Sequence, residues 1–263
     1  MKIGVPKEIK SQENRIGLTP ESVKILTSNG NEVLVENNGG FEAGFYNEQY
    51  KSAGAKILDK AEDIFDDAEI IVKVKEPQPS EVKMIKENQI VFTYLHLAAA
   101  KELTKGLVDS KSVCIAYETV TDNNGRLPLL APMSAVAGRM SVQAGAHCLE
   151  KNQKGRGLLL GGAPGVDPGN VVILGGGVVG ENAAIIATGM KAKVHIVDKS
   201  EQRLNELSKK FGDLIIPKLS DETDLEKLIS ECDLLVGGVL IPGAEAPKLV
   251  TKKMLKNMKR GSV

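Results

Sequence analysis

A short apolar run followed by regularly spaced glycines constrains this chain more than any other feature. Residues 171–174 read Val-Val-Ile-Leu, and Gly175, Gly177 and Gly180 follow with the spacing G-x-G-x-x-G. Such a run of β-branched and leucine residues is typical of a strand buried inside a parallel sheet. The glycines permit a tight turn, a close approach of a pyrophosphate to the backbone, and close packing of the next helix. The pattern predicts a strand–loop–helix unit that binds a dinucleotide.

An acidic residue stands where such a unit needs one. A second apolar strand is expected at Lys193–Val197, and Asp198 follows it, 18 residues after Gly180. Its carboxylate would accept hydrogen bonds from an adenosine ribose, while the helix N-terminus would bind the pyrophosphate. A negative charge there disfavours a 2′-phosphate, so NAD is expected in preference to NADP, although Lys199 and Arg203 soften that preference. The alternative is an ordinary glycine-rich turn.

Length and charge exclude several classes of protein. A chain of 263 residues suggests one large domain or two medium ones. Lysine plus arginine and aspartate plus glutamate number 34 each, so neither a basic excess for nucleic acid nor a charge block for a membrane surface is present. The apolar runs are far shorter than the ~20 residues of a membrane-spanning helix. We therefore expect no nucleic-acid partner and no membrane partner.

The N-terminus and the cysteines indicate a reduced compartment. Residues 1–7 lack the apolar core of a signal peptide and resemble a first strand. The three cysteines are widely spaced and form no C-x-x-C motif, which favours a cytoplasmic protein without a metal site and with thiols as small core residues. They are Cys114, Cys148 and Cys232.

The first half of the chain alternates strands with helices, which is typical of a parallel sheet covered by helices. Thr19 is expected to cap a helix that has Pro20 at its first position and ends at Gly30. The expected strands are Lys2–Val5, Glu32–Glu36, Glu69–Lys75, Ile90–Leu95 and Ser112–Glu118.

A second series follows a change of composition at Gly125–Ser134. A long helix of small residues is expected at Ala135–Lys151, and the glycine-rich stretch Gly155–Asn170 is expected to be a loop. The strands expected after it are Val171–Leu174, Lys193–Val197, Leu214–Ile216 and Leu234–Val239. The pattern predicts an α/β protein with two Rossmann-like parallel-sheet domains, 1–130 and 131–263. The second has four strands and the possible beginning of another near Val263, where about six are common, so it looks unfinished.

Three residues near predicted strand ends suit chemistry on a small acid. Arg15 lies in a polar loop after the first strand, and its planar guanidinium suits a carboxylate. Lys73 and Lys75 alternate with valines and so face one side of their strand, and Lys75 at its exit suits a substrate carbonyl. His96 ends an apolar strand, and an ordinary histidine pKa near ~6.5 suits proton transfer.

Simpler interpretations exist for each of these residues. Arg15 could be solvated, the two lysines could extend from an edge strand into solvent, and His96 could be a core histidine. Ser134 either caps the long helix or faces a bound cofactor. His147 and His195 are expected to be structural.

Further segments extend the pattern over the whole chain: Val5-Pro-Lys-Glu-Ile-Lys10, Val72-Lys-Val-Lys-Glu-Pro77, Tyr94-Leu-His-Leu-Ala98, Ala131-Pro-Met-Ser-Ala-Val-Ala137, Gly162-Ala-Pro-Gly-Val166, Leu240-Ile-Pro-Gly-Ala244 and Ala246-Pro-Lys-Leu-Val250. Together, and in this order, they resemble the alanine dehydrogenase family. The resemblance implies a substrate domain at 1–130, an NAD-binding domain at 131–263, and reversible oxidative deamination of L-alanine to pyruvate and ammonia.

The resemblance also implies roles for individual residues. Arg15 and Lys75 would hold the substrate, Lys75 would stabilise charge on its oxygen, and His96 would be the acid and base. The positions implied to line the NAD site, beside Gly175, Gly177 and Gly180 of the loop, are Ser134, Val178, Val179, Asp198, Arg203, Ser220, Val239 and Leu240. The resemblance further implies assembly as a homo-hexamer.

The sequence departs from the family at two places. The family continues past Gly-Ser-Val263 to a loop with a substrate-facing aspartate, so the chain as written is expected to be inactive, with an open sheet edge. The second departure is Glu181, which places a carboxylate just after the glycine loop.

Two alternative functions remain open. One is the nucleotide-binding subunit of a proton-translocating transhydrogenase, a family that does not keep the histidine of Tyr94-Leu-His-Leu-Ala98. The other is a non-catalytic NAD-binding remnant.

Overall fold

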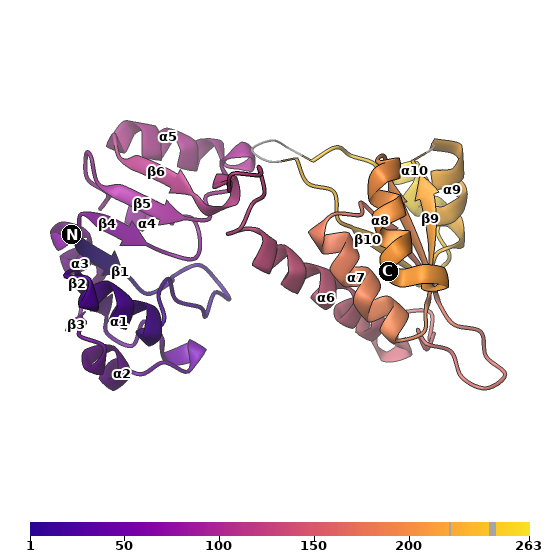
Figure 1. The fold of residues 1–263 in the computed structure, drawn as a ribbon, viewed down its shortest axis with the longest axis horizontal. Coiled ribbons are helices and arrows are strands. Elements are labelled where there is room, and N and C mark those ends of the chain that lie inside the picture. Colours follow the sequence, from indigo (N-terminus) through magenta and orange to yellow (C-terminus); the bar gives the residue numbers. More distant parts are fainter. Residues whose placement is uncertain (221, 242–245) are drawn as a thin grey trace. The chain divides into compact units, whose positions relative to one another are not determined.

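The chain divides into two compact units. The computed structural model describes residues 1–220, 222–241 and 246–263, with the side chains of 222–224 outside the description. The first unit is Met1–Leu129, and the second contains the described residues from Leu130 onward, apart from the segment 242–245 (Figure 1). Each unit has a parallel sheet with helices packed on it, which confirms the predicted α/β fold with two Rossmann-like domains.

The sheet of the first unit is parallel throughout and, in the described residues, has the strand order β3-β2-β1-β4-β5-β6. Its strands are β1 (Lys2–Val5), β2 (Glu32–Glu36), β3 (Lys56–Leu58), β4 (Ile70–Val72), β5 (Ile90–Thr93) and β6 (Val113–Ala116). The direction of winding reverses between β1 and β4, which pair with Ile3 opposite Ile70. Ligands of such sheets bind outside the carboxyl ends of the strands at this reversal.

Helices cover both faces of the first sheet because alternate strand residues are apolar on both sides. Val33 and Val35 of β2 join one cluster with Val23 of α1, whereas Leu34 joins another with Ile64 of α3. The helices are α1 (Pro20–Ser28), α2 (Asn47–Ser52), α3 (Ala61–Asp67), α4 (Pro79–Val82) and α5 (Lys101–Ser110). The predicted start of α1 is confirmed, since the Thr19 side chain accepts the Ser22 N–H and Pro20 is the first helical residue.

The sheet of the second unit has the order β10-β7-β8-β9 among the residues that the structure describes. Its strands are β7 (Asn170–Leu174), β8 (Lys193–Asp198), β9 (Ile215–Leu219) and β10 (Leu234–Gly237), and its helices are α6 (Ala131–Cys148), α7 (Val178–Gly189), α8 (Glu201–Phe211), α9 (Glu222–Glu231) and α10 (Lys252–Asn257). The helix α6 packs along α7 (Figure 1). Gly138 permits this approach, since a Cβ there would overlap the carbonyl oxygen of Val179.

The last residue extends the hydrogen bonding of this sheet. The Val263 N–H donates to the Asp233 carbonyl at 3.0 Å, and the Val263 carbonyl accepts from the Leu235 N–H at 2.8 Å. This is the pattern of a parallel neighbour on β10. The sequence predicted that a further strand begins here. It also predicted an open sheet edge, but the edge of β10 is paired with Val263 at Asp233 and Leu235.

The structure corrects several predicted boundaries. The strand predicted at Glu69–Lys75 ends at Val72, and the three-residue strand β3 was not predicted because it is too short to show a period. The helix α6 begins at Ala131 rather than at residue 135, because Pro132 in a first turn has no N–H that needs a partner. Ser134 is consequently the fourth residue of α6, and the interpretation of Ser134 as a cap is wrong.

Two further observations concern single residues and membrane spans. Cys148 is exposed on α6, so it is not the core residue that we expected, whereas Cys232 is buried and burial raises the pKa of its thiol to about 11. No helix within the described part of the chain is both long and apolar enough to cross a membrane.

Candidate active site

The three candidate residues of the first unit all follow strands that lie side by side. Arg15 lies in the loop after β1, Lys75 follows β4, and His96 follows β5. Because β1, β4 and β5 are neighbours in one parallel sheet, their carboxyl ends meet at the same edge. The fold therefore brings these residues to the edge where a ligand is expected.

Arg15 is held by a carboxylate two residues before it. Its Nε and a terminal nitrogen donate to the two carboxylate oxygens of Glu13 at 2.8 and 2.7 Å. The Glu13 side chain is 10% exposed and that of Arg15 is 49% exposed. The hydrogen bond from Arg15 lowers the pKa of Glu13, so this carboxyl is ionised at neutral pH and orients the guanidinium.

Lys73 is not an exposed edge lysine but a fully buried cation. Its ammonium donates to Glu8 at 3.0 Å and to Glu81 at 2.7 Å, and its side chain is 0% exposed. The strand β4 lies inside the sheet, so the interpretation of Lys73 as a lysine that extends from an edge into solvent is wrong. Burial raises the pKa of Glu81, against the lowering effect of Lys73.

Lys75 shares one carboxylate of this buried cluster through its backbone. Glu8 accepts the N–H of Val74 at 2.5 Å and that of Lys75 at 3.3 Å. The Lys75 ammonium lies 3.7 Å from Glu76 and its side chain is 21% exposed. Lys75 therefore stands at the surface, with its backbone fixed from below by Glu8.

His96 adopts a left-handed backbone conformation, with φ of 51° and ψ of 39°, that few non-glycine residues take. Glu118 holds the backbone at this point, because its carboxylate accepts the N–H of His96 at 2.6 Å and that of Leu95 at 3.1 Å. The imidazole is stacked on the Tyr94 ring, with 6.1 Å between centroids and 16° between planes. His96 is exposed, so it is not a core histidine.

Electrostatic contacts connect these three positions. The Lys75 charge contributes to the lowered pKa of Glu13, the partner of Arg15. Burial raises the pKa of Tyr94, and Arg15 opposes this effect, so Arg15 and Tyr94 lie within electrostatic range. Tyr94 in turn stacks on His96. Glu13 thus relates Arg15 to Lys75, and Tyr94 relates Arg15 to His96.

Sequence reasoning missed the carboxylates that hold these groups. Glu8 and Glu13 lie in the loop that supplies Arg15, and Glu118 follows β6. A local signal existed for Glu13, which is two residues from Arg15 in a polar loop. Glu8 and Glu118 act on segments 66 and 22 residues away, and no local pattern reports such a contact.

In the second unit, the glycine loop between β7 and α7 has the conformation that its spacing predicts. Gly175 has φ of +95°, which a side chain would strain. A Cβ on Gly180 would overlap the Gly175 carbonyl oxygen, so this position requires glycine. At Gly177 a Cβ would meet no described atom within 4 Å, so the loop is open on that side.

This open side fits the phosphates of a dinucleotide. Gly177 precedes the first turn of the twelve-residue helix α7, and within the described residues no side chain caps that turn. Uncapped N–H groups at a helix N-terminus bind anions. The residues present therefore fit a nucleotide cofactor.

Asp198 ends β8 beside the loop and contacts it directly. Its carboxylate accepts the Gly176 N–H at 2.6 Å and the Ser200 N–H at 2.8 Å. Arg203 of α8 approaches the same glycine, donating through Nε to the Gly176 carbonyl at 2.7 Å. The expected ribose carboxylate and a nearby arginine thus lie on either side of one glycine.

Glu181 joins this network from the first turn of α7. Its carboxylate accepts from Arg203 and from Lys210, and Arg203 also donates to Glu206 at 2.9 Å. Partial burial raises the pKa of Glu181, but the hydrogen bonds from Lys210 and Arg203 outweigh it and the pKa falls below its ordinary value. Glu181 is therefore ionised, and its carboxylate is paired with two cations.

The other expected cofactor residues lie around the same edge. Val178 and Val179 open α7, Ser220 follows β9, and Val239 and Leu240 follow β10. The Ser220 N–H donates to the Asp198 carbonyl at 3.0 Å. Ser134 belongs to the same unit but lies on α6. In the motif that begins at Leu240, residues 242–244 lie outside the described residues.

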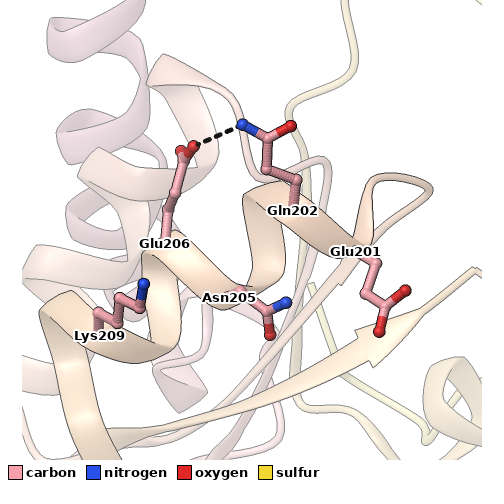
Figure 2. Close-up of a pocket in the computed structure, with 5 residues that line it drawn as sticks. All are labelled: Glu201, Gln202, Asn205, Glu206 and Lys209. Carbon is pink, nitrogen blue, oxygen red and sulfur yellow. Dashed lines mark hydrogen bonds between the residues drawn. The ribbon is translucent and has the colours of Figure 1, made fainter.

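Two surface hollows of the second unit lie elsewhere. One follows the outer side of α8, where Gln202 donates to Glu206 at 3.4 Å (Figure 2). The other is lined mainly by cations, namely Lys151, Lys154, Arg156, Lys259 and Arg260. Both are open and contain no predicted site residue, and no group of metal-ligating side chains occurs within the described residues.

Comparison with known proteins covers both halves of the chain. Residues 4–137 match the family described as alanine dehydrogenase/PNT, N-terminal domain, and residues 141–263 match alanine dehydrogenase/PNT, C-terminal domain. The whole chain is 53% identical to the alanine dehydrogenase of Halomonas elongata and 52% identical to that of Bacillus subtilis. It spans 71% and 69% of their lengths.

Solved structures agree with these matches. A structure of an L-alanine dehydrogenase has a TM-score of 0.91 at 50% identity, over 100% of this chain and 72% of that chain. The transhydrogenase from Sinorhizobium meliloti has a TM-score of 0.81 at 26% identity, over 100% of this chain and 76% of that one. Because the family matches extend through both units and relatives more than half identical align with every residue, this chain belongs to the alanine dehydrogenase/PNT family.

Proposed function

We propose that this chain carries the substrate and cofactor sites of a protein that catalyses the NAD-dependent, reversible oxidative deamination of L-alanine to pyruvate and ammonia. The observation that carries the proposal is the gathering of Arg15, Lys75 and His96 at one sheet edge. The chain that carries them is 53% identical to an alanine dehydrogenase over its full length. The relatives bear that name, and the site has the charges that a small amino acid requires.

Each group has a distinct task on the substrate. Arg15, oriented by Glu13, binds the substrate carboxylate. Lys75 donates to the oxygen that becomes the carbonyl and stabilises the negative charge that develops there. His96 accepts a proton from the water that attacks the iminium carbon and returns one when ammonia leaves.

The second unit holds the cofactor. NAD supplies the acceptor for the hydride that leaves the substrate α-carbon. The loop glycines and the first turn of α7 bind its pyrophosphate, and Asp198 accepts from its adenosine ribose. Val178, Val179, Ser134, Ser220, Val239 and Leu240 are the further residues that we assign to the NAD site.

The test is an assay of the purified protein, in a full-length context, with L-alanine and NAD. We expect NADH formation that depends on L-alanine and yields pyruvate and ammonia in equal amounts, and the reverse reaction from pyruvate, ammonia and NADH. Hydride exchange between NAD and NADP on addition of membrane subunits, without alanine-dependent reduction, would instead support a transhydrogenase subunit. NADH binding with neither activity would support a binding remnant. A cytoplasmic homo-oligomer remains a prediction, for which native mass measurement is the check.

A further inference from the structure

The Arg203 side chain is the cation that a 2′-phosphate on the adenosine ribose would meet. A Cβ on Gly176 would lie 3.3 Å from Asp198 Oδ2 and 3.5 Å from Arg203 Cγ, so the two side chains flank the same point of the loop. In dinucleotide-binding folds the acid at this place selects NAD, and a nearby arginine accommodates the extra phosphate of NADP.

All three guanidinium nitrogens of Arg203 donate hydrogen bonds. Nε donates to the Gly176 carbonyl at 2.7 Å, one terminal nitrogen donates to Glu206 at 2.9 Å, and the other donates to Glu181. Two carboxylates therefore neutralise the single positive charge. Lys210, in the last turn of α8, also donates to Glu181.

The two carboxylates differ in strength as partners. The Glu181 side chain is 23% exposed and accepts from two cations, whereas that of Glu206 is 51% exposed and, within the described residues, accepts from one cation, Arg203. Charge interactions weaken as solvent exposure increases. Glu181 thus carries most of the neutralisation.

We propose that Glu181 is a specificity-determining residue for the cofactor: by pairing with Arg203 and Lys210, it withholds both cations from a ribose 2′-phosphate and adds its own charge to that of Asp198 against NADPH. This inference rests on the proposed function, because it concerns the same cofactor site. Asp198 alone offers hydrogen bonds to the ribose hydroxyls. Glu181 contributes only to the discrimination against the phosphate.

The experiment measures dissociation constants for NADH and NADPH by fluorescence titration, without substrate. In Glu181→Gln we expect NADPH to bind about tenfold more tightly than in the wild type, since one repelling charge is removed and two cations are released. NADH binding should change less than about threefold, because a ribose without the phosphate does not require those cations. Glu206→Gln is the matched control, with an expected change for NADPH of less than about threefold.

A double variant tests whether Arg203 is the cation that Glu181→Gln makes available to the phosphate. Adding Arg203→Ala to Glu181→Gln should abolish the gain in NADPH affinity. Glu181→Ala serves as a second variant, and thermal unfolding confirms that each protein is folded. An unchanged NADPH-to-NADH ratio in both Glu181 variants, an equal gain in Glu206→Gln, or a gain that survives Arg203→Ala would each overturn the inference. Wild-type protein that binds neither nucleotide would instead refute the proposed function, and this inference with it.

Discussion

The two units hold their functional groups by opposite means. In the first unit, side chains hold side chains: Lys73 is fully buried between Glu8 and Glu81, and Glu13 orients Arg15. In the second unit, the loop takes its form from the absence of side chains, as Gly180 shows most clearly.

The energies of the two arrangements differ accordingly. Removing one partner from a buried ion pair leaves an uncompensated charge and costs about 3–5 kcal/mol. Exposed pairs such as that of Lys210, whose side chain is 50% exposed, contribute about 0–1 kcal/mol. The candidate substrate site of the first unit therefore depends on buried ion-pair partners that must all be present. The candidate cofactor site of the second unit depends on the backbone geometry of the glycine loop, and we propose that its ion pairs contribute to the selection of NADH over NADPH.

The largest effect should come from the residue that carries the proton. His96→Ala should lower turnover by about 10²–10⁴-fold while leaving the dissociation constant for NADH nearly unchanged, because the nucleotide site lies in the other unit. Steady-state kinetics and fluorescence titration measure the two quantities, with His147→Ala as the exposed control. More than a tenth of wild-type turnover in His96→Ala would contradict the assignment.

A matched pair of lysine substitutions compares the two ion networks directly. Lys73→Met should lower the free energy of unfolding by about 3–5 kcal/mol, since Glu8 and Glu81 lose their shared cation. Lys210→Met should cost less than about 1 kcal/mol. Denaturant unfolding checks both values, and equal losses would show that the contrast between buried and exposed networks is wrong.

Two glycine substitutions separate folding from cofactor binding in the second unit. Gly180→Ala should destabilise the fold by about 1–3 kcal/mol, because the new methyl group overlaps a backbone carbonyl. Gly177→Ala should leave stability within about 1 kcal/mol, since the methyl group enters open space, yet weaken NADH binding at least about tenfold where the pyrophosphate approaches. Thermal unfolding and NADH titration distinguish them. A Gly177→Ala protein with wild-type affinity would argue against the proposed pyrophosphate position.

The smallest expected effect concerns pH and the buried His195 of β8. Burial lowers the pKa of His195, so between the folded and unfolded pKa values the unfolded chain binds the extra proton. The stabilisation is therefore complete above the ordinary histidine pKa and decreases as pH falls below it, by at most about 1.4 kcal/mol per pH unit for one proton. His195→Gln should flatten this part of the stability profile and His147→Gln should not, as denaturant titrations from neutral to acidic pH would measure.

Much of the fold could be predicted because its signals are local. The strands Lys2–Val5 and Glu32–Glu36 were predicted with the bounds that the structure shows, and so was the start of α1 at Thr19 and Pro20. The glycine loop was predictable for the same reason, since its spacing and the strand before it lie within ten residues.

The rest depended on contacts between distant segments. The alternation of Lys73 with valines indicated a strand face, but its burial depends on Glu8, which is 65 residues away. The left-handed conformation of His96 depends on Glu118, and the start of α6 at Ala131 made Ser134 an internal helical residue. Periodicity describes which way a residue faces and carries no information about the charge it will meet.

Glu8 also has a mechanical consequence. Its carboxylate belongs to the loop that leads from β1 to Arg15, yet it binds the Lys73 ammonium and the N–H groups of Val74 and Lys75. The two segments that we propose bind the substrate carboxylate and its neighbouring carbonyl oxygen are thereby joined beneath the surface. Their spacing is set before any ligand arrives, so a molecule whose carboxylate and carbonyl oxygen match it loses only its own freedom on binding.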